Sequence, residues 1–349
     1  MVLEISVDDI EKTQKWDSFV KMHPAGTPYH LTNWIKTIKE TYHYDPVMYM
    51  DVNKSGKIEC VFPFFLINNI FTSKRIISLP FSDYGGPIAN HQASIQRIIE
   101  TLNNDYSSYI KNIEIRSDIK DYVGYKGLNY YKRHVAKLSS DEEKIYSEIN
   151  KRTIQYSIRK AKKKGVRVYE DNSIEGLKNF IRLNSMTRLK HGVPSQPDKF
   201  FYNLFNNMIS KKNGFILLAE YRSKIIAASV FITVGRQVHY KYNASDLSYL
   251  KEAAPNHLIT WKAIQKGINE GYDVFDFGRT SPDNKGLIRY KRMWGAEEFD
   301  CVYSYFPEIR GASSFAESSI FYKLSTGVWK RLPTFMRSTI GTYIYKYLC

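Results

Sequence analysis

The residues best suited to chemistry lie in the stretch Phe275–Gly295. An apolar strand pattern ends at Gly278, a polar loop carrying Arg279 follows, and a short basic helix carries Lys291. A polar loop between a strand and a cationic helix is a usual place for a substrate site in an α/β domain, because the rigid elements hold the loop. A strand, turn and helix with a solvated basic face would show the same pattern.

The chain is strongly basic, with 51 Lys and Arg against 35 Asp and Glu and a formal net charge of +16. Residues 141–165 show a helical pattern, and no acidic residue interrupts the basic run from 151 to 167. Gly165 is a suitable helix stop. Such a charge favours a polyanionic partner, which could be nucleic acid, anionic lipid or a phosphate-bearing substrate.

The cysteines favour neither a disulfide framework nor a metal site. Cys60, Cys301 and Cys349 are odd in number and lack the spacing of zinc ligands, so we expect no metal and a reducing cytoplasm. The first ten residues are acidic, which is unlike a signal peptide. The most apolar run, Cys60–Leu66, is too short to span a bilayer, so any membrane role is expected to be peripheral, at the inner face.

Two stretches of the chain show the same order of predicted elements. Helices come first, over residues 1–45 in the first stretch and ending with 197–211 in the second. A hairpin and a further strand follow, then a helix and a closing strand; the stretches end near Arg116 and Phe277. This order suggests a duplicated domain. We place an N-terminal domain at 1–138, a second domain beginning with the basic helix at 139–310, and a tail at 311–349.

The tail combines basic and aromatic residues. From Ser318 to Cys349 there is no Asp or Glu, and Pro333 and Gly341 divide the segment into short amphipathic helices. This pattern fits an interfacial membrane anchor. A helix packed on its own domain is the alternative, and helices with apolar faces more often pack in that way.

Several motifs together resemble the Fem-type aminoacyltransferases and their GNAT-like relatives. They extend over most of the chain from about residue 30 to 300, at Leu79–Pro87, Lys151–Val168, Lys190–Pro194, Tyr240–Ser245, Pro255–Leu258, Phe275–Thr280 and Tyr290–Gly295. The resemblance implies a mixed α/β fold of two tandem GNAT-like domains, followed here by the amphipathic tail. That fold agrees with the duplicated order of elements.

The resemblance also implies transfer of an acyl group to an amine. The best-known members move an aminoacyl group from tRNA to an amine of a peptidoglycan precursor, with no cofactor beyond the donor. Lys291 matches the family lysine that stabilises the oxyanion of the transition state. Asp83 or Asp276 would orient the amine, although Asp83 also suits a turn and Asp276 could pair with Arg279.

Further residues are assigned to the substrates on the same grounds. Those expected to bind substrate are Tyr240, Tyr242, Arg279, Lys190, His191, Arg116, Tyr84, Asn256 and Tyr290, with His191 also a candidate base. Those expected to bind donor phosphates are Lys151, Arg152, Arg159 and Lys163. Tyr240 and Tyr242 alternate along a predicted strand, so we expect them on one face, where packing is the common role of tyrosine. The arginines suit phosphate or carboxylate, or an ordinary ion pair.

The sequence departs from the relatives in two places. GNAT enzymes that bind acetyl-CoA carry a Gly-rich pyrophosphate loop at a helix start, and the corresponding stretch Leu250–Asn256 has no glycine. Arg116 stands near where the tRNA-dependent members carry an aspartate. Two alternatives therefore stay open: an N-acyltransferase using acyl-CoA or an acyl carrier, and a non-catalytic RNA- or membrane-binding protein on a transferase fold. No feature of the sequence sets an oligomeric state.

Deleting residues 318–349 should weaken binding to anionic vesicles, because the deletion removes basic and aromatic side chains together. Co-sedimentation with vesicles of increasing anionic lipid content would measure the effect. Unchanged binding would assign the tail to ordinary packing.

Overall fold

The structure is a computed structural model that describes residues 1–69, 72–106, 108, 110–117, 122, 124–192 and 194–307. The expected tail, 311–349, lies outside the described residues. The chain forms two compact units, residues 1–132 with 299–307 and residues 133–298, whereas the sequence placed the boundaries at 138 and 310. In the described part of the chain, no helix is long and apolar enough to cross a bilayer.

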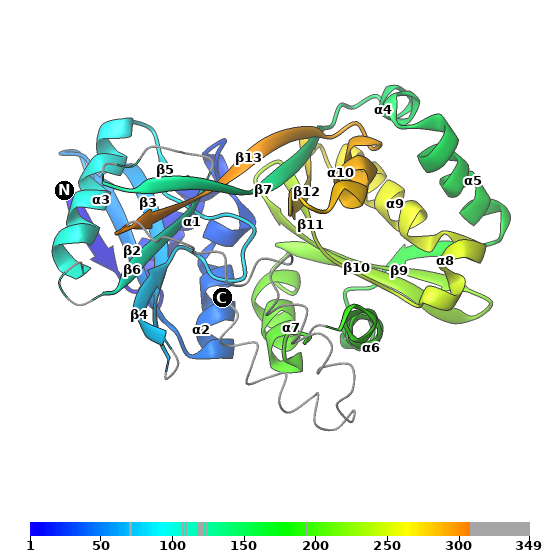
Figure 1. Ribbon diagram of the computed structural model, residues 1–349. Helices are drawn as coiled ribbons and strands as arrows, with labels where there is room; N and C mark the ends of the chain where they lie inside the picture. The colour runs from blue at the N-terminus through cyan, green and yellow to red at the C-terminus, as the bar shows by residue number, and fades with distance from the viewer. Residues whose placement is uncertain are drawn as a thin grey trace. The chain divides into compact units, whose positions relative to one another are not determined.

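The first unit is a mixed sheet with helices on its faces (Figure 1). Its strand order is β1-β2-β3-β4-β6-β13, with β5 paired to β3. The elements are β1 (Val2–Ile5), α1 (Ile10–Met22), a 3-10 turn (Pro28–His30), α2 (Thr32–Tyr42), β2 (Asp45–Val52), β3 (Ile58–Asn69), β4 (Thr72–Ile77), β5 (Ile88–Ala89), α3 (Gln92–Tyr106), β6 (Asn112–Ser117) and β13 (Glu297–Phe306).

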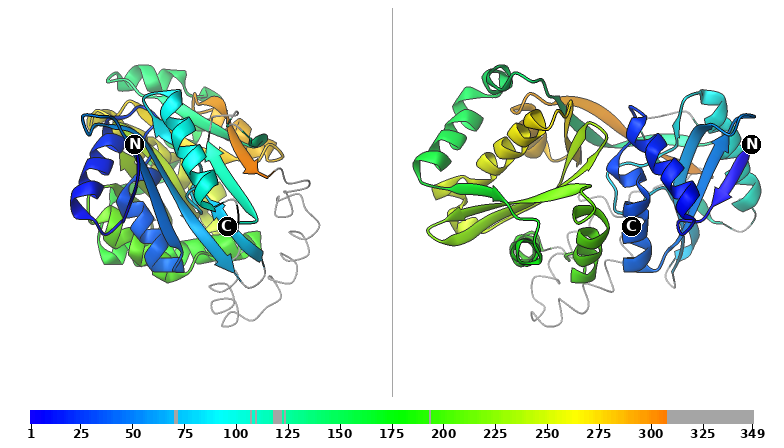
Figure 2. Two further views of the ribbon diagram at one scale, coloured as in Figure 1. Left: turned by 90° about the vertical axis from the view of Figure 1, so that its left-hand side faces the viewer. Right: turned by 180° about the vertical axis from the view of Figure 1, so that it is seen from behind.

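Apolar residues at helical spacing attach α3 to this sheet. Ile95, Ile98, Ile99 and Leu102 are buried against side chains of β2 and β3 such as Phe62. Alternation along the strands leaves the other face for α1 and α2, which Figure 2 shows on the opposite side of the sheet from α3.

The second unit has the strand order β7-β12-β11-β10-β9-β8. Helices α5 and α9 cover one face, and α6 and α7 cover the other (Figure 1). The elements are β7 (Lys126–Lys137), α4 (Glu142–Glu148), α5 (Tyr156–Lys163), β8 (Arg167–Glu170), α6 (Ile174–His191), α7 (Asp198–Leu204), β9 (Gly214–Tyr221), β10 (Lys224–Val234), β11 (Gln237–Ser245), α8 (Leu247–Ala253), α9 (Pro255–Asn269), β12 (Val274–Thr280) and α10 (Lys285–Arg292).

Both units repeat one topology, which confirms the tandem GNAT-like fold. Two helices precede three consecutive antiparallel strands, and a helix then returns the chain to a strand parallel to the third. In the first unit β4 pairs with β6 in parallel, and in the second β11 pairs with β12 in parallel. The crossover helices are α3 and α9.

The structure corrects three element predictions. Residues 1–45 were expected to be helical, but Val2–Ile5 pairs with β2 as a strand. The helix expected over 141–165 is divided into α4, a π-helical turn at Lys151–Gln155, and α5. The helix expected over 197–211 likewise changes to a π-helical turn at Phe205–Ile209. A π turn is a single turn inside an otherwise helical segment, so the helical patterns on either side conceal it in the sequence.

Candidate functional site

Strands β11 and β12 form a fork that positions the central residues of the second unit. Their parallel pairing covers only Gln237–His239 against Val274–Asp276, after which the strands lose register with each other. Beyond the fork, Gly278 has a left-handed backbone with φ of 71°, which bends β12 where a residue with a Cβ would be strained.

Lys291 is held at the end of this fork. Its side chain comes from α10 and is 6% exposed. The Nζ donates to the carbonyl oxygen of Gly278 at 2.9 Å and to that of Arg279 at 3.3 Å. Two backbone carbonyls thus fix an ammonium group in a sheltered position, where a cation interacts more strongly with a developing negative charge than it would in water.

Asp276 is fully buried and lies at the vertex of the fork. Its Oδ2 accepts a hydrogen bond from Arg133 Nε at 2.8 Å and lies 3.5 Å from His239 Nδ1. Its Oδ1 accepts from the backbone N–H of Gly278 at 2.6 Å. Pairing with Arg279 was one alternative that the sequence left open for Asp276, and the structure shows an ion pair with Arg133. These contacts suit a group that orients protein atoms better than one that receives a substrate amine.

Tyr240 and Tyr242 lie on opposite faces of the sheet, so the expectation of one shared face is wrong. The β10–β11 register shifts so that Val230 faces Tyr242 and Phe231 faces Tyr240, which leaves Lys241 as the extra residue of a bulge. The Tyr240 ring stacks on Phe231 on the α9 side. The Tyr242 ring packs at 5.6 to 6.2 Å from three phenylalanines of α6 and α7, Phe180, Phe200 and Phe201.

A second group of polar side chains gathers around the start of α9. The Tyr240 hydroxyl lies 2.9 Å from Asn243 Nδ2 and 3.2 Å from Ser229 Oγ. Asn256 accepts from the same Asn243 amide at 3.3 Å. Burial raises the pKa of Tyr240 and that of Tyr290, so both hydroxyls stay protonated and can donate hydrogen bonds at neutral pH.

His257 extends this group toward α10. Its ring lies edge-on to Tyr290, with centroids 5.6 Å apart, and faces Trp294 at 6.5 Å. Burial lowers the pKa of His257 to about 4, so the imidazole is neutral at pH 7. Its Nδ1 is buried without a hydrogen-bond partner among the described residues.

The remaining predicted substrate residues of the second unit are less enclosed. Arg279 is half-buried on β12, and Lys190 is exposed near the end of α6. The side chain of His191 is outside the described part of the structure. Their binding roles stay predictions.

In the first unit, Asp83 lies in a tightly held loop between β4 and β5. Leu79 and Phe81 both have positive φ, at 45° and 62°. Such strain persists only where surrounding contacts enforce it. Here Tyr29 OH donates to Asp83 Oδ2 at 2.6 Å, and the Tyr84 ring is edge-on to Tyr29 at 6.0 Å. The loop is therefore more than a solvated turn.

Arg116 forms a buried ion pair in the same unit. Its Nε lies 2.5 Å from Glu114 Oε1, and its guanidinium lies 5.1 Å from the ring centre of Tyr303. The side chain is 8% exposed. Its guanidinium is committed to these protein groups, as the ion-pair interpretation of the sequence anticipated.

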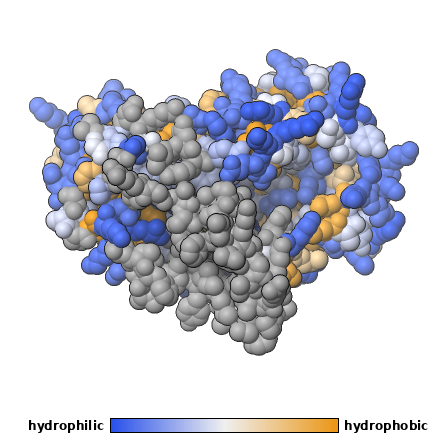
Figure 3. All heavy atoms as spheres, in the orientation of Figure 1, coloured by the Kyte–Doolittle hydropathy of each residue, from blue (hydrophilic) through white to orange (hydrophobic). Residues whose placement is uncertain are grey.

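The basic helix has one apolar face and one cationic face. Ile154, Ile158 and Ala161 are fully buried toward α9. The predicted phosphate-binding residues Lys151, Arg152, Arg159 and Lys163 are exposed. Within the described ranges, no ion pair engages five cations here: Lys151, Arg152, Lys162, Lys163 and Lys164. Tyr156, 57% exposed, lies among them. Figure 3 shows a mostly hydrophilic surface over α4 and α5.

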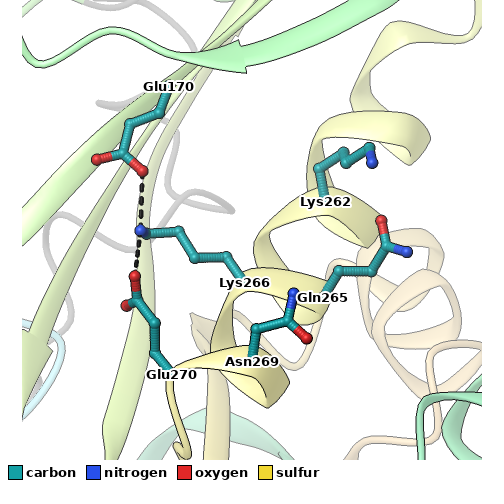
Figure 4. Close-up of a pocket in the computed structure, with 6 residues that line it drawn as sticks. All are labelled: Glu170, Lys262, Gln265, Lys266, Asn269 and Glu270. Atoms are coloured by element: carbon teal, nitrogen blue, oxygen red, sulfur yellow. Dashed lines mark hydrogen bonds and ion pairs between the residues drawn. The ribbon is translucent and has the colours of Figure 1, made fainter.

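Two hollows border α9. One, of about 550 Å³, lies among residues of α4, the π turn, α5 and α9, including Tyr146, Lys151 and Trp261. The other, of about 400 Å³, lies between β8 and α9, where Figure 4 shows Lys266 between Glu170 and Glu270. Lys291 lines neither hollow. Among the described residues, no group of three or more His, Cys, Asp or Glu could hold a metal ion.

Sequence reasoning missed Arg133, His239 and the bulge at Lys241. A single arginine in a basic chain carries no signal of burial. Only the pairing of β7 beside β12 places its side chain on Asp276.

Comparisons with known proteins find similarity to acyltransferases. Residues 150–292 match the acetyltransferase (GNAT) domain family. The lipid II:glycine glycyltransferase of Staphylococcus haemolyticus (strain JCSC1435) is 21% identical, over 91% of this chain and 95% of that protein. The enzyme of the same name from Staphylococcus aureus (strain COL) is 20% identical over the same shares.

Solved structures share the fold at low sequence identity. The crystal structure of FemX has a TM-score of 0.72 at 15% identity, covering 87% of this chain and 96% of that one. The structure of L-PGS from Bacillus licheniformis has a TM-score of 0.57 at 13% identity, covering 93% and 98%.

The burial of His257 predicts an acid-sensitive contribution to stability. An unfolded histidine takes up its proton near pH 6.5, and the folded one only near pH 4, so stability falls as pH falls through this window. Between about pH 7.5 and about pH 5.0, the unfolding free energy should fall by about 2 kcal/mol more in the wild type than in His257→Phe. Urea denaturation at both pH values measures this difference, and equal losses in the two proteins would contradict it.

Proposed function

We propose that this transferase, whose tandem GNAT-like fold resembles that of FemX, moves an aminoacyl group from tRNA to an amine of a lipid-linked cell-envelope precursor. The amine nitrogen attacks the ester carbonyl carbon, and a tetrahedral oxyanion forms. The ester C–O bond then breaks, the ribose hydroxyl of the tRNA leaves with a proton that comes from the amine, and an amide remains on the acceptor. No cofactor takes part.

The position of Lys291 carries the proposal. The oxyanion needs a fixed cation or hydrogen-bond donor close to it, and preorganised groups of this kind provide a large share of catalysis in acyl transfer. Lys291 offers an ammonium group that two carbonyls hold at the strand fork. A surface lysine would lack both the burial and the fixed direction.

The cationic face of α5 supports a polynucleotide donor. Exposed lysines and arginines without carboxylate partners keep their full charge for phosphate contacts, which provide most of the sequence-independent affinity for nucleic acid. At the start of α9, where acetyl-CoA enzymes place a Gly-rich loop, this chain has helix α8 followed directly by Ala254 and Pro255. Pro255 has no N–H to offer a pyrophosphate, which favours tRNA over acyl-CoA.

The names of the relatives support the acceptor. Lipid II is the substrate in the name of the staphylococcal enzymes, which match this chain over almost its full length. An acceptor with a lipid anchor would place the reaction at the inner face of the cell membrane, with the protein in the cytoplasm.

Reversing two charges on α5 should weaken donor binding. In Lys162→Glu/Lys163→Glu, the dissociation constant for aminoacyl-tRNA should rise at least about tenfold at about 0.1 M salt, and the salt dependence should become shallower. The matched control Lys211→Glu/Lys212→Glu changes the net charge equally at exposed sites in the turn before β9 and should shift binding less than about threefold. Fluorescence anisotropy with charged and uncharged tRNA measures both. Equal effects of the two variants would remove α5 from the interface, and tight acyl-CoA binding in place of tRNA binding would favour a thioester donor.

Lys291→Ala should lower kcat by more than about tenfold, equal to about 1.4 kcal/mol or more of transition-state stabilisation. Single-turnover transfer of a radiolabelled aminoacyl group to a lipid II acceptor measures the rate, and circular dichroism checks that the variant is folded. A rate close to that of the wild type would exclude Lys291 from the mechanism. Absence of transfer by the wild type with every donor would favour a non-catalytic binding protein.

A further inference from the structure

A continuous series of contacts leads from β7 to the ammonium group of Lys291. It begins at Arg133, whose side chain is 21% exposed and whose Nε–H donates to Asp276 Oδ2 at 2.8 Å. The other oxygen of Asp276 accepts the backbone N–H of Gly278 at 2.6 Å. The carbonyl of Gly278 then accepts from Lys291 Nζ at 2.9 Å.

The backbone of Gly278 links the carboxylate of Asp276 to the ammonium group of Lys291. A carboxylate two residues earlier in the strand draws the Gly278 N–H toward Asp276 while the left-handed φ of 71° turns the chain. Because peptide planes are rigid, fixing the N–H and φ of Gly278 restricts where its carbonyl can lie. That carbonyl, together with the one of Arg279, is what Lys291 binds.

The charge of Arg133 is needed because Asp276 is fully buried. An ionised carboxylate without a counter-charge in such a place is unstable and tends to become protonated or to draw in water. His239 lies at the same vertex, with Nδ1 3.5 Å from Asp276 Oδ2. His239 and Asp276 form the last residue pair before β11 and β12 separate. The carboxylate therefore lies where the two strands stop sharing hydrogen bonds.

We infer that Arg133 and Asp276 are positioning residues for the Lys291 ammonium group, acting through the backbone of Gly278. The inference rests on the proposed function for the catalytic role of Lys291, but the placement of Lys291 can be measured without any substrate. Arg133 has no sequence signal for this role. Asp276 has this positioning role instead of the expected contact with the substrate amine.

The test uses the double variant Arg133→Gln/Asp276→Asn, which removes both charges of the ion pair together, so that neither is left without the other. Competitive acetylation of the full-length protein, followed by mass spectrometry, gives the labelling rate of Lys291 relative to the other lysines. We expect this rate to rise at least about fivefold, because the freed strand end no longer shields the amine.

A matched control removes the equivalent pair near the start of β12. Arg236 and Asp273 form an exposed ion pair, with side chains 70% and 54% exposed, so Arg236→Gln/Asp273→Asn should leave Lys291 labelling within about twofold of the wild type. A double variant at Arg133 and Asp276 that is folded and labels Lys291 at the wild-type rate would overturn the inference. If that variant does not fold, Asp276→Asn alone decides by the same comparison, with a rise of at least about twofold expected.

Kinetics separate positioning from general destabilisation. With the aminoacyl-tRNA and acceptor of the proposed reaction, kcat of the double variant should fall at least about tenfold, while KM for both substrates stays within about threefold. A rise in KM with unchanged kcat would assign the pair to substrate binding and would overturn the inference. If the wild type transfers nothing, the proposed function fails, and the labelling comparison still decides how Lys291 is placed.

Discussion

The divergence of β11 from β12 is the constraint on which the second unit depends. Parallel strands that separate lose their shared hydrogen bonds, and the exposed backbone groups need other partners. Here the partners are side chains: Asp276 accepts from the N–H of Gly278, and Lys291 donates to the carbonyl. The candidate chemistry therefore uses groups that the fold already needs in order to close the strand ends.

In the first unit, the strands β4 and β6 also separate, and a different ion pair lies at that place. Its parallel strands β4 and β6 pair up to Ile77 and Glu114, which is the register position that Asp276 has in β12. Glu114 binds Arg116 two residues later on its own strand, whereas Asp276 binds Gly278 two residues later and an arginine from β7. The duplicated topology thus has a buried carboxylate at the same place twice, and among the described residues only the second unit combines it with a glycine and a helix-borne lysine.

The excess positive charge of the chain is organised rather than spread evenly. On α5 the apolar residues face α9 and the cations face solvent. Burying the apolar face therefore turns the cationic face toward solvent. The π turn before α5 supports this arrangement, because Gln155 is buried there and binds the carbonyls of Tyr146 and Ile149, which attaches the helix to α4. The cationic surface is in this way part of the same packing that forms the core.

The sequence by itself determined the class of fold, the order of elements and the cationic helix, and its motifs made Lys291 a candidate for oxyanion stabilisation. These depend on local periodicity, on capping and turn residues, and on motifs that lie within short stretches of chain. Tertiary structure decided the rest. One bulge residue, Lys241, separates Tyr240 from Tyr242 across the sheet, and a period of two in the sequence cannot show it. Asp276 lies 143 residues from Arg133, and Arg116 pairs with Glu114 instead of remaining free for substrate. Such pairings depend on which strands become neighbours, and a buried charge takes the nearest opposite charge that the assembled sheet provides.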